Sequence, residues 1–177
     1  MTRINLDTNK VASQSQTLLA QIQTAFGMTP NMFKAVSNSP AALQSMWSSF
    51  AALGKGRLGA KLGEQIAVAI ANANRCEYCL AAHTVLGQAA GATAEEMQAA
   101  QRGQSSDLKT AAVLAFALKA VKHRAQVEAG DVNGLRELGF DDEHIVEIMA
   151  HVALNVYTNY INIALDVPVD FPKVVLV

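Results

Sequence analysis

The chain has 177 residues, of which 51% are hydrophobic, 16% are charged and 6% are aromatic. This composition excludes a disordered chain, and a formal net charge of −1 leaves no electrostatic attraction to nucleic acids or anionic membranes. The length favours a single domain over residues 1–177. Because so apolar a chain has few charges for its surface, we also expect apolar surface to be buried between subunits of a homo-oligomer.

Apolar residues recur at helical spacing between capping and stop signals, and no run alternates as a strand would. The sequence therefore predicts an all-α fold, a helical bundle of about eight helices. The first helix is predicted at 11–26, two more begin at Pro30 and Pro40, and a glycine-rich connector occupies residues 54–63. Further helices are predicted at about 64–71, after Asn74, from Thr93 to Gly103, from Asp107 to about Ala129, from Asp131 to Gly139 and from Asp141 to about Leu165.

The N-terminal stretch MTRINLDTNK has no apolar segment of the kind that a secretory signal needs. Apolar runs such as AAVLAFALKAV at 111–121 are interrupted by Lys119 and are shorter than the ~18 residues of a membrane span. We therefore expect a cytoplasmic protein without a membrane partner. In that reducing compartment, two neighbouring cysteines are more often catalytic or metal-binding than a structural disulfide.

A faint internal similarity links two segments of the chain. IANANRCEYCLAAHTVL at 70–86 can be laid over MAHVALNVYTNYINIAL at 149–165. The two cysteines and the histidine of the first segment then fall opposite Asn155, Thr158 and Asn162. This pattern indicates a possible repeat of a helical hairpin in which only the first copy retained thiol chemistry.

The stretch CEYCLAAH at 76–83 contains both cysteines of the chain and one of its four histidines. Asn74 followed by Glu77 is typical of a helix N-cap with its glutamate partner, which would place Cys76 in the first helical turn. The positive end of the helix dipole and the unpaired N–H groups there favour a thiolate. This local argument alone favours Cys76 as the more reactive thiol.

Helical spacing places the three groups of this stretch on one face. Cys79 and His83 are four residues apart, so the imidazole and the thiol are neighbours. Cys76 and Cys79 are three apart, a separation at which a reversible disulfide can close. The sequence therefore predicts a pair of thiols with an adjacent general base.

Glu64 adds a geometric expectation. In one continuous helix Glu64 would lie about 18 Å from Cys76 and could not take part in its chemistry. If the chain folds back at the interruption Asn72-Ala73-Asn74, Glu64 becomes level with His83. Because a carboxylate beside an imidazole orients the ring and raises its basicity, the expected relay runs from Glu64 through His83 to Cys79.

Two other interpretations of these residues stay open. The cysteines can be packing residues of an alanine-rich core, as cysteine often is. C-x2-C-x3-H also supplies three zinc ligands, with Glu64 as a fourth, although the sequence lacks the second Cys or His pair of most structural zinc sites. The remaining histidines have no constellation of cysteine or acidic residues around them and are assigned to the surface or core: His123, His144 and His151.

The pattern E-x11-C-x2-C-x3-H, formed by Glu64, Cys76, Cys79 and His83, resembles the alkylhydroperoxidase D-like branch of the carboxymuconolactone decarboxylase superfamily. The segments TPNMFKAVSNSP and NVYTNYINIALDVPVDFP are also similar to peroxidase-related members of that branch. The resemblance covers most of the chain from about Met28. It implies an all-helical fold, assembly into trimers or hexamers, and thiol peroxidase chemistry without a cofactor or metal.

The resemblance also implies a role for each residue of the motif. Cys79 would be the peroxidatic thiol and Cys76 the resolving thiol, while His83 and Glu64 would form the proton relay. A hydroperoxide would be the substrate, and an external dithiol would reduce the enzyme again. One position departs from the family pattern, since Tyr78 stands where well-studied members have a relay histidine, and a phenol with a pKa near ~10 is a poor base at neutral pH.

Two functions compete with peroxide reduction. A lactone decarboxylase of the same superfamily would need a general acid or base and an anion site, but it would have no use for two thiols. A non-enzymatic module stabilised by zinc, or sensing redox state through its oligomer, would use the thiols without turnover.

Overall fold

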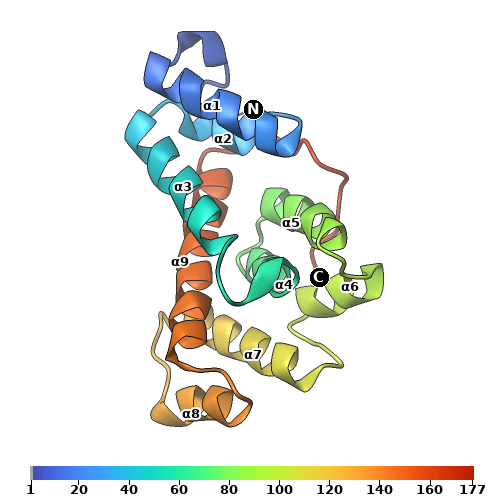
Figure 1. Ribbon diagram of the computed structural model, residues 1–177. Helices are drawn as coiled ribbons and strands as arrows, with labels where there is room; N and C mark the ends of the chain where they lie inside the picture. Colours follow the sequence, from blue (N-terminus) through green and yellow to red (C-terminus); the bar gives the residue numbers. More distant parts are fainter. Residues whose placement is uncertain (1) are drawn as a thin grey trace.

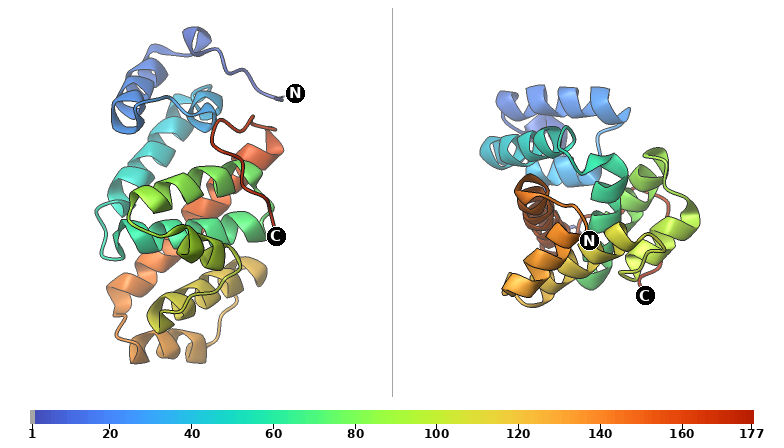
Figure 2. Two further views of the ribbon diagram at one scale, coloured as in Figure 1. Left: turned by 90° about the vertical axis from the view of Figure 1, so that its right-hand side faces the viewer. Right: turned by 60° about the horizontal axis from the view of Figure 1, so that its bottom comes forward.

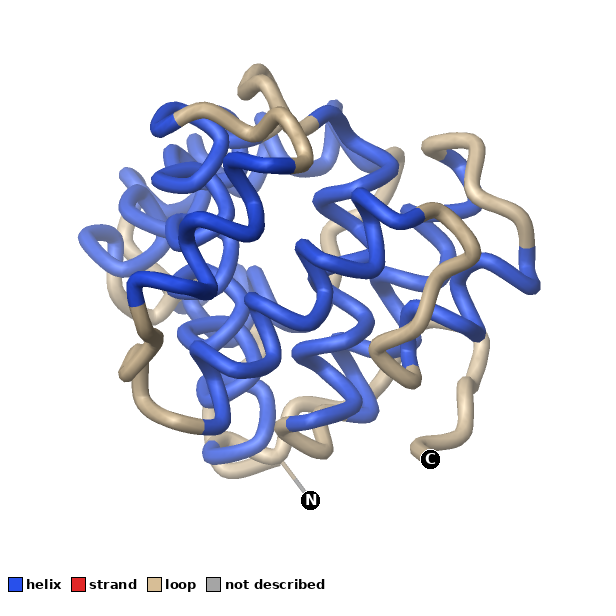
Figure 3. Tube along the Cα trace, turned by 90° about the horizontal axis from the view of Figure 1, so that it is seen from below, coloured by secondary structure: helices blue, strands red, loops and turns tan. Residues whose placement is uncertain are grey.

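The computed structural model describes residues 2–177. Within that range the only regular secondary structure is helical, with loops between the helices and no strand (Figures 1 and 3). The all-α prediction is confirmed, with nine α-helices in this range rather than about eight. The elements are the 3-10 helix η1 (Thr8–Lys10), α1 (Ser13–Phe26), α2 (Asn31–Val36), α3 (Pro40–Leu53), α4 (Gly59–Ala73), α5 (Glu77–Ala89), α6 (Ala94–Gln101), α7 (Leu108–Lys122), α8 (Ala129–Glu137) and α9 (Asp142–Ala164).

The long helix α9 runs along the molecule, with α1–α3 at one end and α7 and α8 at the other (Figures 1 and 2). The helix α4 lies at the centre and packs against α5, α6, α7 and α9. Residues 65–71 of α4 are all buried, which follows from a sequence that is apolar on every side of the helix. The hairpin of α4 and α5 therefore lies inside the fold, with α9 alongside it.

The turn between α4 and α5 confirms the predicted fold-back, but its capping residue differs from the prediction. Asn74 keeps a helical backbone as the C-cap of α4, and Arg75 has a φ of 61° that reverses the chain. The N-cap of α5 is therefore Cys76, which has an extended backbone. Its sulfur accepts a hydrogen bond from the backbone N–H of Cys79 at 3.3 Å. Cys76 lies just before the first helical turn rather than inside it.

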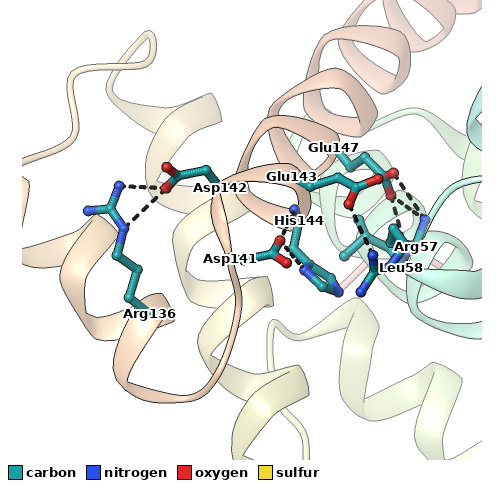
Figure 4. Close-up of polar contacts among 8 residues, drawn as sticks. All are labelled: Arg57, Leu58, Arg136, Asp141, Asp142, Glu143, His144 and Glu147. Atoms are coloured by element: carbon teal, nitrogen blue, oxygen red, sulfur yellow. Dashed lines mark hydrogen bonds and ion pairs between the residues drawn. The ribbon is translucent and has the colours of Figure 1, made fainter.

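The helix α4 begins at Gly59, so the second half of the predicted glycine-rich connector is helical. Glu147 of α9 anchors this start, because its carboxylate accepts the backbone N–H groups of Arg57 at 2.7 Å and Leu58 at 3.1 Å (Figure 4). N–H groups before the first turn of a helix have no intrahelical partner, so this carboxylate satisfies them. The contact fixes the position of α4, and with it the position of Glu64.

The boundary between α7 and α8 also differs from the prediction. The helix α7 ends at Lys122 rather than near Ala129, because Arg124 and Ala125 have positive φ values of 54° and 63°. Asp131 does not open α8 but lies in its first turn, where its carboxylate accepts the N–H of Glu128 at 2.7 Å.

The second copy of the suggested repeat is not a hairpin. The helix α9 passes through residues 149–164 without a break, whereas 70–86 contain the reversal at Arg75. Leu154 falls opposite Arg75 and continues the helix, because leucine is a good helix former and its side chain is buried. The similarity between the two segments is therefore one of helical composition.

Beyond α9 the chain turns back and runs along α5 towards α6 (Figure 1). Gln101 donates to the carbonyl of Val175 at 2.8 Å, and the side chain of Asn72 accepts the N–H of Val177 at 3.0 Å. This terminal segment places Phe171 against the ring of Tyr78 in α5. None of the helices in residues 2–177 combines the length and the hydropathy of a membrane span.

Candidate active site

Both cysteines lie at the start of α5 and are buried, with 1% and 2% of their surfaces exposed. They are free thiols, and the Sγ atom of Cys76 lies 2.7 Å from the Sγ atom of Cys79. A disulfide bond needs a separation of about 2.05 Å, so a small movement of the two side chains would allow one to form. The two thiols are in direct contact because Cys76 is the N-cap of α5 and Cys79 is its third helical residue.

Glu64 and His83 meet across the α4–α5 hairpin, as the fold-back predicts. The Oε2 atom of Glu64 lies 2.7 Å from the Nδ1 atom of His83. Burial lowers the pKa of His83, but the charge of Glu64 and its hydrogen bond outweigh burial and raise that pKa above the usual value. The imidazole is therefore held in a fixed orientation with an increased affinity for a proton.

The surroundings of the two thiols differ, and this difference decides which of them carries charge. Burial raises the pKa of Cys79, but the hydrogen bond from Cys76, the charge of His83, the hydrogen bond from Asn162 and the carboxamide of Asn159 lower it to about 7. The pKa of Cys76 is raised, first by its hydrogen bond to Cys79 and then by burial. These opposite directions favour a thiolate at Cys79, with Cys76 as the donor, whereas the position of Cys76 at the helix terminus favours a thiolate at Cys76.

Tyr78, the residue in place of the family's relay histidine, belongs to the wall of the site. Its hydroxyl oxygen accepts the backbone N–H of Met32 at 3.1 Å, and its ring packs edge-on against Phe171 at a centroid distance of 5.8 Å. Burial raises the pKa of this phenol further, and the carboxylate of Asp170 adds to the effect. Tyr78 therefore stays protonated and does not act as a base.

A narrow cavity of about 30 Å³ reaches Cys79 and His83. This volume accommodates one or two water molecules. Its walls come mainly from apolar and aromatic side chains, among them Phe26, Met32, Phe33, Phe50, Leu86 and Phe171. A second cavity of about 100 Å³ also touches His83, together with Glu64, His151 and Asn155. The Glu64–His83 pair thus borders two separate spaces.

Two of the histidines assigned to the surface or core have acidic groups near them after all. The Nδ1 atom of His144 lies 2.6 Å from Oδ1 of Asp141, the N-cap of α9 (Figure 4). The ring of His151 packs against Gly63, where an added Cβ would lie 2.9 Å from its Cε1 atom, and it lines the second cavity with Glu64. Burial lowers the pKa of His151, which favours the neutral ring.

The sequence analysis did not identify any residue of α9 as part of the site. The Nδ2 atom of Asn162 donates to Sγ of Cys79 at 3.1 Å, and Asn159 also lowers the pKa of that thiol. A signal was present, because four polar residues share a buried face of this otherwise apolar helix: Asn155, Thr158, Asn159 and Asn162. Buried polar side chains of this kind need partners, and here a thiol supplies one.

Within residues 2–177 no cluster of three or more His, Cys, Asp or Glu side chains has an arrangement that could hold a metal ion.

Residues 40–123, which contain all four residues of the motif, match the model of the carboxymuconolactone decarboxylase family. A search of curated proteins found no match.

Several solved structures have the same fold. An uncharacterized peroxidase-related protein from Silicibacter sp. TM1040 is 24% identical with a TM-score of 0.83, covering 98% of this chain and 92% of the other. An uncharacterized peroxidase-related protein from Ralstonia eutropha JMP134, described as an alkylhydroperoxidase AhpD core, is 24% identical with a TM-score of 0.85, covering 96% and 92%. The debrominase Bmp8 is 21% identical with a TM-score of 0.77, covering 96% and 91%. Residues 40–123 therefore resemble the carboxymuconolactone decarboxylase family, and the chain as a whole shares the fold of the alkylhydroperoxidase AhpD core.

Proposed function

We propose that the protein is a thiol-dependent peroxidase that reduces organic hydroperoxides with the Cys76–Cys79 dithiol. The observation that carries this proposal is the pair of buried thiols at 2.7 Å, of which Cys79 has a pKa lowered to about 7 beside the Glu64–His83 pair. A thiolate at neutral pH is the form of cysteine that attacks peroxides. The family match and the peroxidase-related neighbours support an enzymatic role of this kind.

The first step transfers one oxygen atom to Cys79. Its thiolate attacks the terminal oxygen of the hydroperoxide, the O–O bond breaks, and Cys79 becomes a sulfenic acid while an alkoxide leaves. His83 gives a proton to that alkoxide, so the product is an alcohol. Because Nδ1 of His83 is bound to Glu64, Nε2 is the nitrogen left for this exchange.

The second step closes the disulfide. The thiol of Cys76 attacks the sulfur of the sulfenic acid, the S–O bond breaks, and one molecule of water leaves. The two electrons that reduced the peroxide have then come from the two thiols, so the cycle requires no metal or organic cofactor. An external dithiol restores both thiols by disulfide exchange and is itself oxidised, which suits a reducing compartment such as the cytoplasm.

A thiol count tests this proposal. Reduced protein should show two titratable thiols under denaturing conditions, none after a small excess of an organic hydroperoxide, and two again after dithiothreitol. The same excess of the corresponding alcohol is the matched control. A count that stays at two after the hydroperoxide would overturn the proposal.

The aromatic walls of the cavity at Cys79 support reductive debromination as a second candidate. A dithiol can supply the two electrons that replace a C–Br bond by C–H, and the products are bromide, a proton and the disulfide. Bmp8 is called a debrominase, and a cysteine-to-alanine variant of it was solved with 2,3,4-tribromopyrrole. Bromide release from brominated pyrroles by the reduced protein, with no loss of thiols to hydroperoxide, would favour this activity.

We also propose that the protein is a homo-oligomer, a trimer or a hexamer. Val146 and Tyr160 of α9 are 67% and 61% exposed, and Ile163 close by is 45% exposed. Exposed apolar residues on one helix are typical of a subunit contact. Sedimentation should show a species of three or six chains, and Tyr160→Glu should shift it towards the monomer.

A further inference from the structure

The buried face of α9 brings carboxamide groups to the sulfur of Cys79, although 83 positions separate Asn162 from that cysteine. The Nδ2 atom of Asn162 donates to Sγ of Cys79 at 3.1 Å, and only 3% of Asn162 is exposed. A neutral thiol is a weak acceptor, whereas a thiolate accepts several hydrogen bonds. A buried amide aimed at a sulfur atom therefore favours the anion.

Asn159, one turn earlier on α9, is completely buried. Its Oδ1 atom accepts a hydrogen bond from Nδ2 of Asn74 at 3.0 Å, which sets the orientation of the carboxamide. Its own Nδ2 is buried and has no hydrogen-bond partner in the protein. Such an orphan donor is rare in native proteins and marks a place where negative charge develops or a ligand binds. Asn159 shares the buried face of α9 with Asn162, and its carboxamide is one of the groups that lower the pKa of Cys79.

We propose that Asn159 and Asn162 form a donor pair that stabilises negative charge on the sulfur of Cys79, and so makes Cys79 rather than Cys76 the attacking thiol. This inference rests on the proposed dithiol function. Asn162 touches the reacting sulfur and is a catalytic residue in this scheme. Asn74 acts through Asn159 and is a positioning residue.

The donor pair resolves a competition between two adjacent thiols. The N-terminal end of α5 favours a thiolate at Cys76, whose sulfur already accepts the backbone N–H of Cys79. At Cys79 the amide of Asn162 adds a hydrogen bond from α9, and the unpaired Nδ2 of Asn159 is a second buried donor available to the anion. Hydrogen bonds in such a buried site are stronger than in solution. Because carboxamides carry no charge, they stabilise the thiolate without competing with His83 for a proton. The thiol of Cys76 then donates its hydrogen bond to the sulfur of Cys79, and Cys79 does not donate to Cys76.

The test is a titration of single thiols, followed through the ultraviolet absorbance of the thiolate. In a Cys76→Ser background only Cys79 titrates, and its midpoint is compared with and without Asn162→Leu or Asn159→Leu. Loss of one hydrogen bond to the anion should raise the midpoint by about one pH unit and reduce the thiolate fraction at neutral pH roughly fivefold. Asn162→Asp should raise it at least as much, because it places a carboxylate beside the sulfur.

Two controls separate this role from a structural one. Thr158→Val alters the same buried face, but Thr158 bonds only within α9, to the carbonyl of Asn155 at 3.1 Å, so the Cys79 midpoint should not move. In a Cys79→Ser background, the substitutions at Asn159 and Asn162 should leave the midpoint of Cys76 in place. Helix content by circular dichroism is recorded for each variant, and Asn162→Asp, which preserves the side-chain shape, serves if the leucine variants fail to fold.

Each outcome has one meaning for the proposal. A higher midpoint in the Asn162 and Asn159 variants, with Thr158→Val unchanged, supports the donor pair. An unchanged midpoint in folded Asn162→Leu and Asn162→Asp overturns it. Because the titration uses no peroxide, a protein that fails the thiol count but shows the shift would lose the peroxidase assignment and keep the donor pair.

Discussion

The carboxylate of Glu64 lies 2.7 Å from the imidazole of His83, across 19 positions of sequence and a reversal of the chain at Arg75. The distance follows from two helices of similar length on either side of a short turn. Glu147 of α9 holds the start of α4, and the cap at Cys76 fixes the start of α5. The base of the proposed relay is thus positioned by backbone contacts at both ends of the hairpin.

Replacing Glu64 should weaken the thiolate. Glu64→Gln keeps the size of the side chain but removes its charge, so the pKa of His83 falls and its positive charge beside Cys79 is lost. We expect the rate of thiol oxidation by an organic hydroperoxide to fall roughly tenfold or more at neutral pH. Stopped-flow measurement at several pH values should show the loss shrinking as the pH rises. A pH-independent loss would contradict a role through ionisation.

Stability should depend on pH through the Glu64–His83 pair. The folded-state pKa of His83 is raised, so the pair stabilises the fold fully below the unfolded pKa of about 6.5. That stabilisation is lost as the pH rises through the higher folded-state pKa. In a Cys79→Ser background, urea unfolding should therefore give a free energy that falls from pH 6 to pH 9 more steeply than in the same protein with Glu64→Gln. Parallel pH profiles would contradict the assignment.

The two cysteines should give different products with hydroperoxide. Cys79→Ser should lose the fast reaction, because burial still raises the pKa of the remaining thiol of Cys76, and that thiol lacks the charge of His83 that lowers the pKa of Cys79. Cys76→Ser should still react once and stop at a sulfenic acid on Cys79, since no second thiol is present to resolve it. Trapping with dimedone followed by mass spectrometry locates the adduct. Full turnover by Cys79→Ser would show that the roles are reversed or shared.

Removal of the Tyr78 hydroxyl should affect stability more than chemistry. Tyr78→Phe leaves the buried N–H of Met32 without its acceptor, at a cost of about 1–3 kcal/mol in the free energy of unfolding. The rate of thiol oxidation should change less than about twofold, because this phenol stays protonated and contributes no base. Chemical denaturation and peroxide kinetics on the same preparation test both parts. A large loss of rate at unchanged stability would show that the Tyr78 hydroxyl takes part in proton transfer.

The anchor at the start of α4 can be tested with two glycines. An added Cβ at Gly56 would lie 2.6 Å from Oε2 of Glu147, so Gly56→Ala should displace that carboxylate from the N–H groups it binds. We expect a loss of about 1–2 kcal/mol in the free energy of unfolding. Gly134→Ala is the matched control, because Gly134 lies inside α8 with open space around it and alanine should stabilise that helix by up to about 1 kcal/mol.

Much of the local structure could be predicted because its causes lie within about four residues of each other. The caps at Thr93, Asp107 and Asp141 form the hydrogen bonds that the sequence predicts. The α4–α5 hairpin could also be predicted locally, since the interruption at 72–74 and the regular rise of a helix are enough to bring Glu64 to His83. The wrong boundaries, at Gly59 and Lys122, lie where tertiary contacts or positive φ values override local preference.

The sequence by itself determined the helical class and the proximity of two thiols, a histidine and a carboxylate: Cys76, Cys79, His83 and Glu64. Only the tertiary structure showed which groups surround each thiol, because Asn159 and Asn162 lie about 80 residues further along the chain than Cys79. The cavity walls were decided in the same way, since Phe26 and Phe171 reach Cys79 from opposite ends of the sequence. Periodicity and capping act between neighbours in sequence, whereas burial and hydrogen bonding at a site depend on how the whole chain packs.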